Sequence, residues 1–184
     1  KVRRLGVLSQ DPVHAHPTHP YQAFLQGLRE LGWVEGQNLA VESRFSAGKA
    51  DLLPRLAAEL VDLPVDLIVA IATPPALAAA AATGTVPIVF IQVADPVGLG
   101  IVPSLARPGA NVTGLSNMLP EISAKRLQLL KELLPRATRV AVLWNRSNKA
   151  SELQIREFER ASRQFGLELK DIGVSSRGEL KDAV

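Results

Sequence analysis

Several residues of this chain follow directly after apolar runs and carry groups able to hold a small polar molecule. Their hydroxyl, amide and carboxylate groups form hydrogen bonds, and a proline here marks the start of a helix. In open parallel sheets, ligands bind beyond the carboxyl ends of the strands. The predicted ligand-binding residues at these ends are Ser9, Gln10, Thr73, Pro74, Gln92, Asp95 and Asn145.

The junction at Thr73 joins an apolar run at 65–72 to an alanine-rich helix. Its hydroxyl suits an N-cap that accepts from a first-turn N–H, and Pro74 suits the first helical position. Such a helix start favours an anion such as a carboxylate. Pro75 removes a second donor, which leaves Ala76 and Leu77 with free N–H groups. A capped structural helix without a ligand is the alternative, and the sequence does not favour either one.

Two further residues have both a functional and a structural interpretation. Asp95, which precedes Pro96, could bind a cationic group, but a turn is slightly favoured. Trp144 could stack on a ligand, although a tryptophan that ends a core strand more often packs.

All three histidines, His14, His16 and His19, lie in one short loop. Three imidazoles can bind a metal ion. Three prolines stiffen this loop in an extended form, however, and Asp11 is the one carboxylate nearby. A solvated loop is therefore the favoured interpretation, and no metal site is predicted.

No enzyme signature is present in the sequence. It lacks G-x-S-x-G, a phosphate-binding glycine loop and G-x-G-x-x-G after a strand. The absence of cysteine excludes disulfides and thiolate chemistry. We therefore expect a non-enzymatic protein without a cofactor.

Short β-rich runs alternate with amphipathic helical runs along the first part of the chain, which predicts a parallel α/β sheet. Strands are expected at 2–9, 38–45, 65–72, 86–93 and 111–116, and helices at 21–32, 51–63 and in the alanine-rich segment. The run at 86–93 has almost no polar face, so it is expected to be central and covered on both sides.

The pattern restarts after Ser116. A leucine-rich helix at 121–135 precedes a strand at 138–145, and RVAVLWN at 139–145 resembles RLGVLSQ at 4–10. We therefore expect two similar α/β domains, at 1–116 and 117–184. The second has two strands, fewer than the usual four to six. Its apolar stripes need a partner surface, so we expect self-association through 121–184.

Composition narrows the possible partners. The 184 residues carry a net charge of +3 and are 4% aromatic, without a concentrated basic stripe, so no nucleic-acid partner is expected. No apolar run approaches a membrane span. The chain begins at Lys1, which either a processed export signal or an experimentally trimmed chain would explain.

Several segments, in this order, resemble the substrate-binding proteins of ABC transporters, in the tryptophan/tyrosine-binding-like group. They are FLQGLRELGWVEGQNLAVESRFSAGKADLLPRLAAELV, ATPPALAAA, VPIVFIQVADPVGLG, SLARPGANVTGLS, KRLQLLKELLP and RVAVLWN. The resemblance covers essentially the whole chain. It implies two doubly wound parallel-sheet lobes of periplasmic-binding-protein type I, the second lobe incomplete here.

The resemblance also implies a function: two lobes close on a small solute, commonly an amino acid, and deliver it to a membrane permease. It implies that Ser9, Thr73, Asp95 and Asn145 lie at the cleft, that 114–117 is a hinge strand, and that the location is periplasmic or extracytoplasmic. The family usually has alanine where Pro75 stands, which weakens carboxylate capture by the helix start. A ligand-sensing regulatory domain of the same fold is the alternative; it predicts a helix-turn-helix before Lys1, where the transport function predicts a signal peptide.

Overall fold

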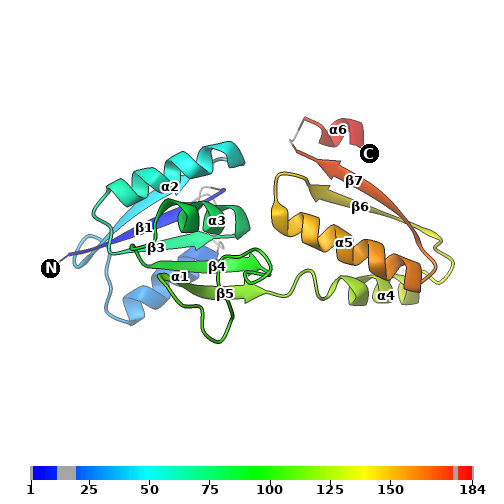
Figure 1. Ribbon diagram of the computed structural model, residues 1–184, viewed down its shortest axis with the longest axis horizontal. Helices are drawn as coiled ribbons and strands as arrows, with labels where there is room; N and C mark the ends of the chain where they lie inside the picture. The colour runs from blue at the N-terminus through cyan, green and yellow to red at the C-terminus, as the bar shows by residue number, and fades with distance from the viewer. Residues whose placement is uncertain (1, 12–19, 176–177, 184) are drawn as a thin grey trace. The chain divides into compact units, whose positions relative to one another are not determined.

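The computed structural model describes residues 2–11, 20–175 and 178–183. The chain divides into two compact units, Lys1–Ser116 and Asn117–Val184. Each unit is described by itself (Figure 1).

The first unit is built on one sheet of five strands in the order β2-β1-β3-β4-β5. The pairs β1–β2, β1–β3 and β3–β4 are parallel. Its elements are β1 (Arg3–Ser9), α1 (Pro20–Glu30), β2 (Leu39–Phe45), η1 (Ala50–Leu52), α2 (Leu53–Asp62), β3 (Leu67–Ile71), α3 (Thr73–Ala82), β4 (Ile88–Ala94) and β5 (Val112–Asn117). The predicted alternation of strands and helices is confirmed, with strand ends shifted by one or two residues.

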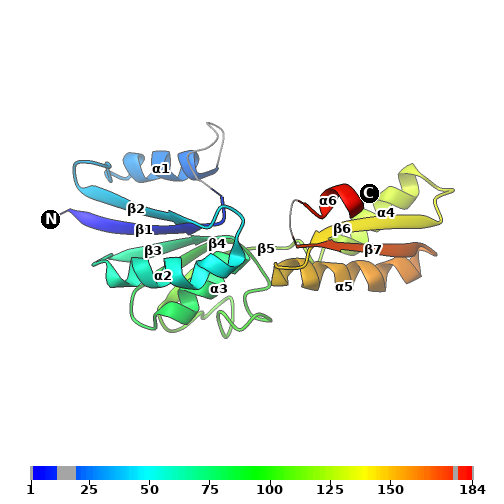
Figure 2. The same cartoon turned by 90° about the horizontal axis from the view of Figure 1, so that it is seen from above.

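Helices cover both faces of this sheet. Figure 2 shows α1 on one face and α2 with α3 on the other. Successive strand side chains point to opposite faces. Accordingly, Val7 of β1 packs in the cluster that contains Tyr21 of α1, whereas Leu8 packs in the cluster of α2 and α3. β1 therefore lies in the interior of a doubly wound sheet.

The alanine-rich helix α3 packs closely against the sheet because its side chains are small. Ala76 and Ala79 are fully buried beside Ile88 and Phe90 of β4. This close approach brings the start of α3 next to the carboxyl ends of β3 and β4, where ligand-binding residues are predicted.

The second unit contains a sheet of two parallel strands, β6 and β7, in register from Arg139↔Glu168 to Asn145↔Val174. Its elements are α4 (Ser123–Leu133), β6 (Arg139–Asn145), α5 (Lys149–Gln164), β7 (Glu168–Val174) and α6 (Leu180–Ala183). Leu127 of α4, Ala161 of α5 and Leu167 form its small core. The predicted two-strand second sheet is thus confirmed among the described residues.

In the part of the chain that the structure describes, no helix is both long enough and apolar enough to cross a membrane.

Candidate functional site

The end of β1 is held by hydrogen bonds to the segment that follows β2. The N–H groups of Ser46 and Gly48 donate to the carbonyl oxygens of Ser9 and Gln10, each at 3.1 Å. The buried Ser9 hydroxyl donates to the Asp11 carbonyl at 2.5 Å. Ser9 therefore stabilises the turn after β1 through its hydroxyl and carbonyl groups. The half-buried Gln10 is the neighbouring side chain that lines a cavity.

Thr73 does not cap α3, which corrects the sequence-based prediction. It is the first residue of the helix, Ala72 occupies the N-cap position, and no side chain caps the helix there. The Thr73 hydroxyl instead accepts a hydrogen bond from the Ala94 N–H at 3.2 Å. Thr73 therefore ties the start of α3 to the end of β4, a contact that local sequence rules do not anticipate.

The donors at the start of α3 also differ from the prediction. Pro74 is the second helical residue, not the first, and neither it nor Pro75 has an N–H. The Ala76 N–H donates to the Ala72 carbonyl at 3.2 Å, so it is not free. The Ala72 N–H donates to the Ile91 carbonyl at 2.8 Å. Two of the first residues of α3 therefore have no N–H, and the N–H of the next residue is engaged.

Three non-glycine residues near the carboxyl ends of β3 and β4 have a positive φ: Ala72 at 76°, Gln92 at 60° and Asp95 at 42°. Left-handed backbone is uncommon outside glycine and costs about 1–3 kcal/mol per residue unless the surroundings impose it. Hydrogen bonds hold two of the three, since the Ala72 N–H reaches β4 and the Asp95 carboxylate accepts from the Gly98 N–H at 2.9 Å. The strained backbone of the sheet is thus concentrated where the strands end.

The Asp95 carboxylate forms the predicted turn. A Cβ added to Gly98 would lie 2.1 Å from Asp95 Oδ2, so a larger residue here would displace this carboxylate from its position in the turn. One carboxylate oxygen is thereby engaged in the turn.

A cavity of about 170 Å³ lies at the carboxyl ends of β1, β3 and β4. Two of the predicted residues, Gln10 and Gln92, line it together. The remaining walls are Asp11, Tyr21, Phe24, Ile71, Ala72 and Ile91. Amide groups and a carboxylate thus combine with aromatic and aliphatic walls, a combination suited to a small amphipathic molecule.

Sequence reasoning missed Tyr21 and Phe24 as cavity residues. They lie three apart on α1 with ring centroids 6.1 Å apart. Burial raises the pKa of Tyr21 above its ordinary value of 10.0, and Glu35 adds to the rise, while a hydrogen bond with the Ser43 side chain opposes it. Tyr21 is the chain's one tyrosine and lies in the first turn of the helix that follows the first strand. This position at the carboxyl end of the first strand is the sequence signal that could have identified it.

A second cavity of this unit, about 330 Å³, lies at the opposite ends of the same strands. Its walls include Phe24, Leu28 and Trp33, and the ion pair of Arg3 with Asp66, at 2.6 Å, lies beside it. It is larger than the first cavity but almost wholly apolar and lies at the amino ends of the strands. Parallel sheets place ligands at the carboxyl ends, so the smaller cavity is the candidate site.

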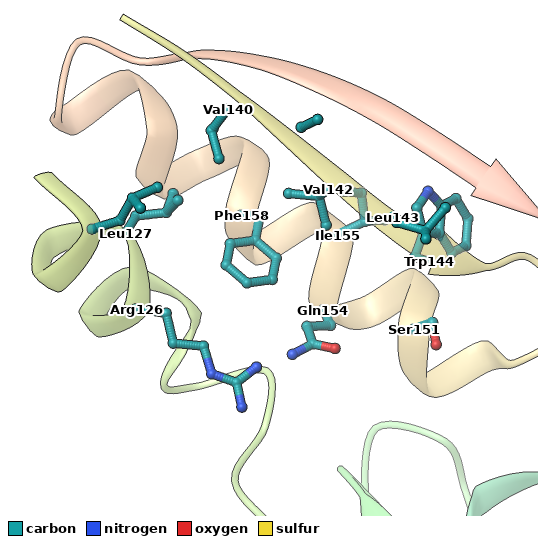
Figure 3. Close-up of a pocket in the computed structure, with 12 residues that line it drawn as sticks. Arg126, Leu127, Val140, Val142, Leu143, Trp144, Ser151, Gln154, Ile155 and Phe158 are labelled. Atoms are coloured by element: carbon teal, nitrogen blue, oxygen red, sulfur yellow. The ribbon is translucent and has the colours of Figure 1, made fainter. Parts of the chain in front are cut away.

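In the second unit, Asn145 ends β6, and its side chain accepts a hydrogen bond from the Ser147 N–H at 2.8 Å. Neighbouring Trp144 lines a cavity of about 430 Å³ beside β6 (Figure 3) and donates its indole N–H to Asp171. The histidine loop, His14, His16 and His19, lies outside the described residues.

The comparisons with known proteins agree with this architecture. The profile of the family "ABC transporter substrate binding protein" matches residues 12–184. A tyrosine-binding protein of Clostridioides difficile is 32% identical over all 184 residues, which span 52% of that relative. The chain therefore spans about half the length of the curated relative that it matches.

Two solved structures are similar over the whole chain and over 61% of their own lengths. One is a conserved domain protein of Vibrio cholerae, at 31% identity and a TM-score of 0.90. The other is an ABC domain of Streptococcus pneumoniae in complex with L-Trp, at 30% identity and a TM-score of 0.87. A leucine-binding protein of Thermotoga maritima, 18% identical with a TM-score of 0.71, shares the fold.

These matches confirm the expected fold class, doubly wound α/β of the periplasmic-binding-protein type I, with the second lobe incomplete in this chain. The chain belongs to the ABC transporter substrate-binding protein family.

Proposed function

We propose that this chain is the solute-binding component of an ABC importer and that it binds a small polar solute, with amino acids first among the candidates. The observation that carries the proposal is the cavity at the carboxyl ends of the first sheet, where Gln10 and Gln92 meet Tyr21 and Phe24. Family membership supports it, as do the similar proteins described as binding tyrosine and L-Trp. Binding, not catalysis, is the proposed activity.

The chemistry of the cavity fits an amino acid. Side-chain amides can accept from an ammonium group or donate to a carboxylate. The aromatic and aliphatic walls can bury an apolar side chain. A volume of about 170 Å³ is below the roughly 300–1,000 Å³ of complete ligand sites. We infer that this cavity is one wall of the site and that a second lobe supplies the rest, with Asn145 as its predicted contact.

The start of α3 contributes less to anion binding than a helix start usually does. Pro74 and Pro75 have no N–H, and the Ala76 N–H donates to the Ala72 carbonyl. We infer that carboxylate recognition relies mainly on side-chain amides, with Thr73, Pro74 and Asp95 shaping the edge of the site.

The proposed function also implies partners and a location. The solute would be passed to a permease in the membrane, and the protein would act in the periplasm or another extracytoplasmic compartment. The 184-residue chain would self-associate through 121–184, because α4 and the residue after it leave Leu129, Leu133 and Leu134 exposed. It would also bind solute much more weakly than a full-length chain with a complete second lobe, since each lobe supplies part of the contact.

Thermal-shift titrations test the proposed function. L-tyrosine, L-tryptophan and L-leucine are added at increasing concentration, with glucose and ribose as controls. A ligand at 100 times its Kd stabilises the folded state by about 2.7 kcal/mol, so a binder gives a melting temperature that rises with concentration.

Variants connect a response to the cavity. Gln92→Ala should weaken the amino-acid response, whereas Gln26→Ala, on the exposed face of α1, should leave it unchanged. A clear response to sugars with none to amino acids would contradict the proposal.

A further inference from the structure

The loop that follows β6 begins with an arginine whose position is fixed by the sheet of the second unit. Arg146 comes directly after Asn145, the last residue of β6. Its N–H donates to the carbonyl of Val174, the last residue of β7, at 2.9 Å. Arg146 therefore lies where the carboxyl ends of both strands meet, which is the end at which parallel sheets bind ligands.

Gly173 of β7 accommodates the Arg146 side chain. Gly173 is the one buried residue of this strand, and because it has no side chain, its burial is due to groups that lie over its backbone. A Cβ added to Gly173 would lie 2.8 Å from Arg146 Cγ, nearer still to Arg146 Nε, and 3.1 Å from Trp144 Cε2. A glycine within a strand often marks such a close approach. The arginine side chain thus lies across β7 and beside the indole ring.

Packing, and not an ion pair, holds this arginine. The carboxylate of Asp171, two residues before Gly173, accepts a hydrogen bond from the indole N–H of Trp144 and forms no ion pair with Arg146. Within the part of the chain that the structure describes, the guanidinium forms no hydrogen bond either, and the residue is exposed. Its N–H groups are therefore available to a solute.

The internal repeat gives Arg146 a counterpart in the first unit. RLGVLSQ at 4–10 is similar to RVAVLWN at 139–145, and the next residues in this alignment are Asp11 and Arg146. Asp11 lines the cavity at the carboxyl end of β1, beside Gln10. The same position of the repeat thus carries a carboxylate in one unit and a guanidinium in the other. These two groups complement the ammonium group and the carboxylate of an amino acid.

The first unit supplies little positive charge for a carboxylate. Pro74 and Pro75 have no N–H at the start of α3, and the Ala76 N–H is engaged. Gln10 and Gln92, which line the cavity, have neutral amides. A guanidinium can instead bind a carboxylate through two parallel charge-assisted hydrogen bonds, each about twice as strong as a neutral one.

We propose that Arg146 binds the carboxylate group of the solute and that Gly173 and Trp144 hold the arginine in position. This role rests on the proposed function, and it narrows the solutes to molecules with a free carboxylate. Asp11, at the corresponding position of the first unit, suits the ammonium group of an amino acid. Gly173 is a positioning residue, because it acts through Arg146.

Trp144 fluorescence reports on this site directly. Trp33→Phe leaves Trp144 as the only tryptophan, because the chain contains two. The probes are L-phenylalanine, L-phenylalaninamide, which lacks the carboxylate, and phenylacetate, which lacks the ammonium group; none absorbs at 295 nm, where tryptophan is excited. The 184-residue chain should bind L-phenylalanine about tenfold more tightly than the amide, and phenylacetate should also change the Trp144 emission.

Substitutions then assign the carboxylate preference to the arginine. Arg146→Gln should lower the affinities for L-phenylalanine and phenylacetate about tenfold, with little change for the amide. Arg146→Lys keeps the charge without the bidentate geometry and should retain part of the preference. Gly173→Ala should displace the arginine and reduce the same preference. Arg139→Gln, at the amino end of β6, makes the same change in charge and should leave all three affinities unchanged.

The ratio of acid affinity to amide affinity separates binding from folding. A variant that merely loses structure, which circular dichroism detects, weakens acid and amide alike and leaves their ratio unchanged. An unchanged ratio in a folded Arg146→Gln variant, or Trp144 emission that responds to no carboxylate in the parent chain, would overturn the role of Arg146. An unchanged ratio in Gly173→Ala would remove the positioning role of the glycine.

Failure of the proposed function gives a different result. A response to sugars with none to L-phenylalanine would contradict solute binding as proposed. A phenylacetate response that disappears in Arg146→Gln would even then support Arg146 as a carboxylate-binding residue.

Discussion

Replacing Thr73 by valine tests whether a single hydroxyl joins α3 to β4. The Thr73 Oγ1 atom accepts from the Ala94 N–H at 3.2 Å, and both residues are only 2% exposed. Valine has nearly the same shape, so the substitution removes the acceptor without creating a cavity. The Ala94 N–H then remains buried without its partner, and water cannot replace the lost bond.

The expected cost follows from that unpaired N–H. A buried donor that loses its acceptor costs about 1–3 kcal/mol. For a unit of this size, each kcal/mol lowers the melting temperature by about 4 °C. Thr73→Val should therefore lower it by roughly 4–12 °C in scanning calorimetry. Hydrogen exchange of the Ala94 amide should accelerate in the same variant.

Two controls separate the hydroxyl from the rest of the side chain. Thr73→Ser keeps the acceptor and loses one methyl group, which costs about 0.8 kcal/mol, and it should leave the Ala94 amide protected. Thr113→Val places the same change at an exposed position of β5 and should be nearly silent. If Thr73→Val is as stable as the wild type, or Thr73→Ser is equally costly, the hydrogen bond does not stabilise the junction. A loss of solute affinity beyond the loss of stability would place the hydroxyl in the site.

Three further changes have expected outcomes. Gly114→Ala should destabilise the first unit strongly in urea unfolding, because its Cβ would lie 2.1 Å from the Phe90 carbonyl oxygen. The control Gly27→Ala lies in a helix with nothing within 4 Å of the added Cβ, and it should stabilise the unit by about 0.5–1 kcal/mol. Equal effects of the two substitutions would contradict this steric argument. Asn148→Ala should destabilise the second unit by about 1 kcal/mol, because the Asn148 side chain accepts from the Ala150 N–H at 3.0 Å and caps the start of α5. Unfolding followed by Trp144 fluorescence measures this loss, and Asn148→Asp should preserve the cap. Phenolate absorbance at 295 nm should show Tyr21 titrating above its unfolded pKa of 10.0. The raised pKa stabilises the folded state with Tyr21 protonated; this stabilisation is complete below the unfolded pKa and is lost as pH rises through the folded pKa. Tyr21→Phe should therefore flatten the decline of the unfolding free energy at alkaline pH. A phenolate that forms at the ordinary value would contradict the burial argument.

The order of strands and helices could be predicted from the sequence because it depends on local periodicity. Leu53, Leu56 and Leu60 recur at helical spacing and lie in the buried core. The apolar run 86–93 needs cover on both faces, and it became β4 between β3 and β5. The likeness of 4–10 to 139–145 indicated a repeated unit. These signals lie within short windows of sequence, where propensity and pattern act directly.

Contacts between distant residues could be seen only in the tertiary structure. Thr73 looked like a helix cap, but its partner Ala94 is 21 residues away and meets it only because β3 and β4 are neighbours. Gln10 and Gln92 were each predicted from strand ends, whereas their shared cavity, with Tyr21 as a wall, depends on the order of strands and the position of α1.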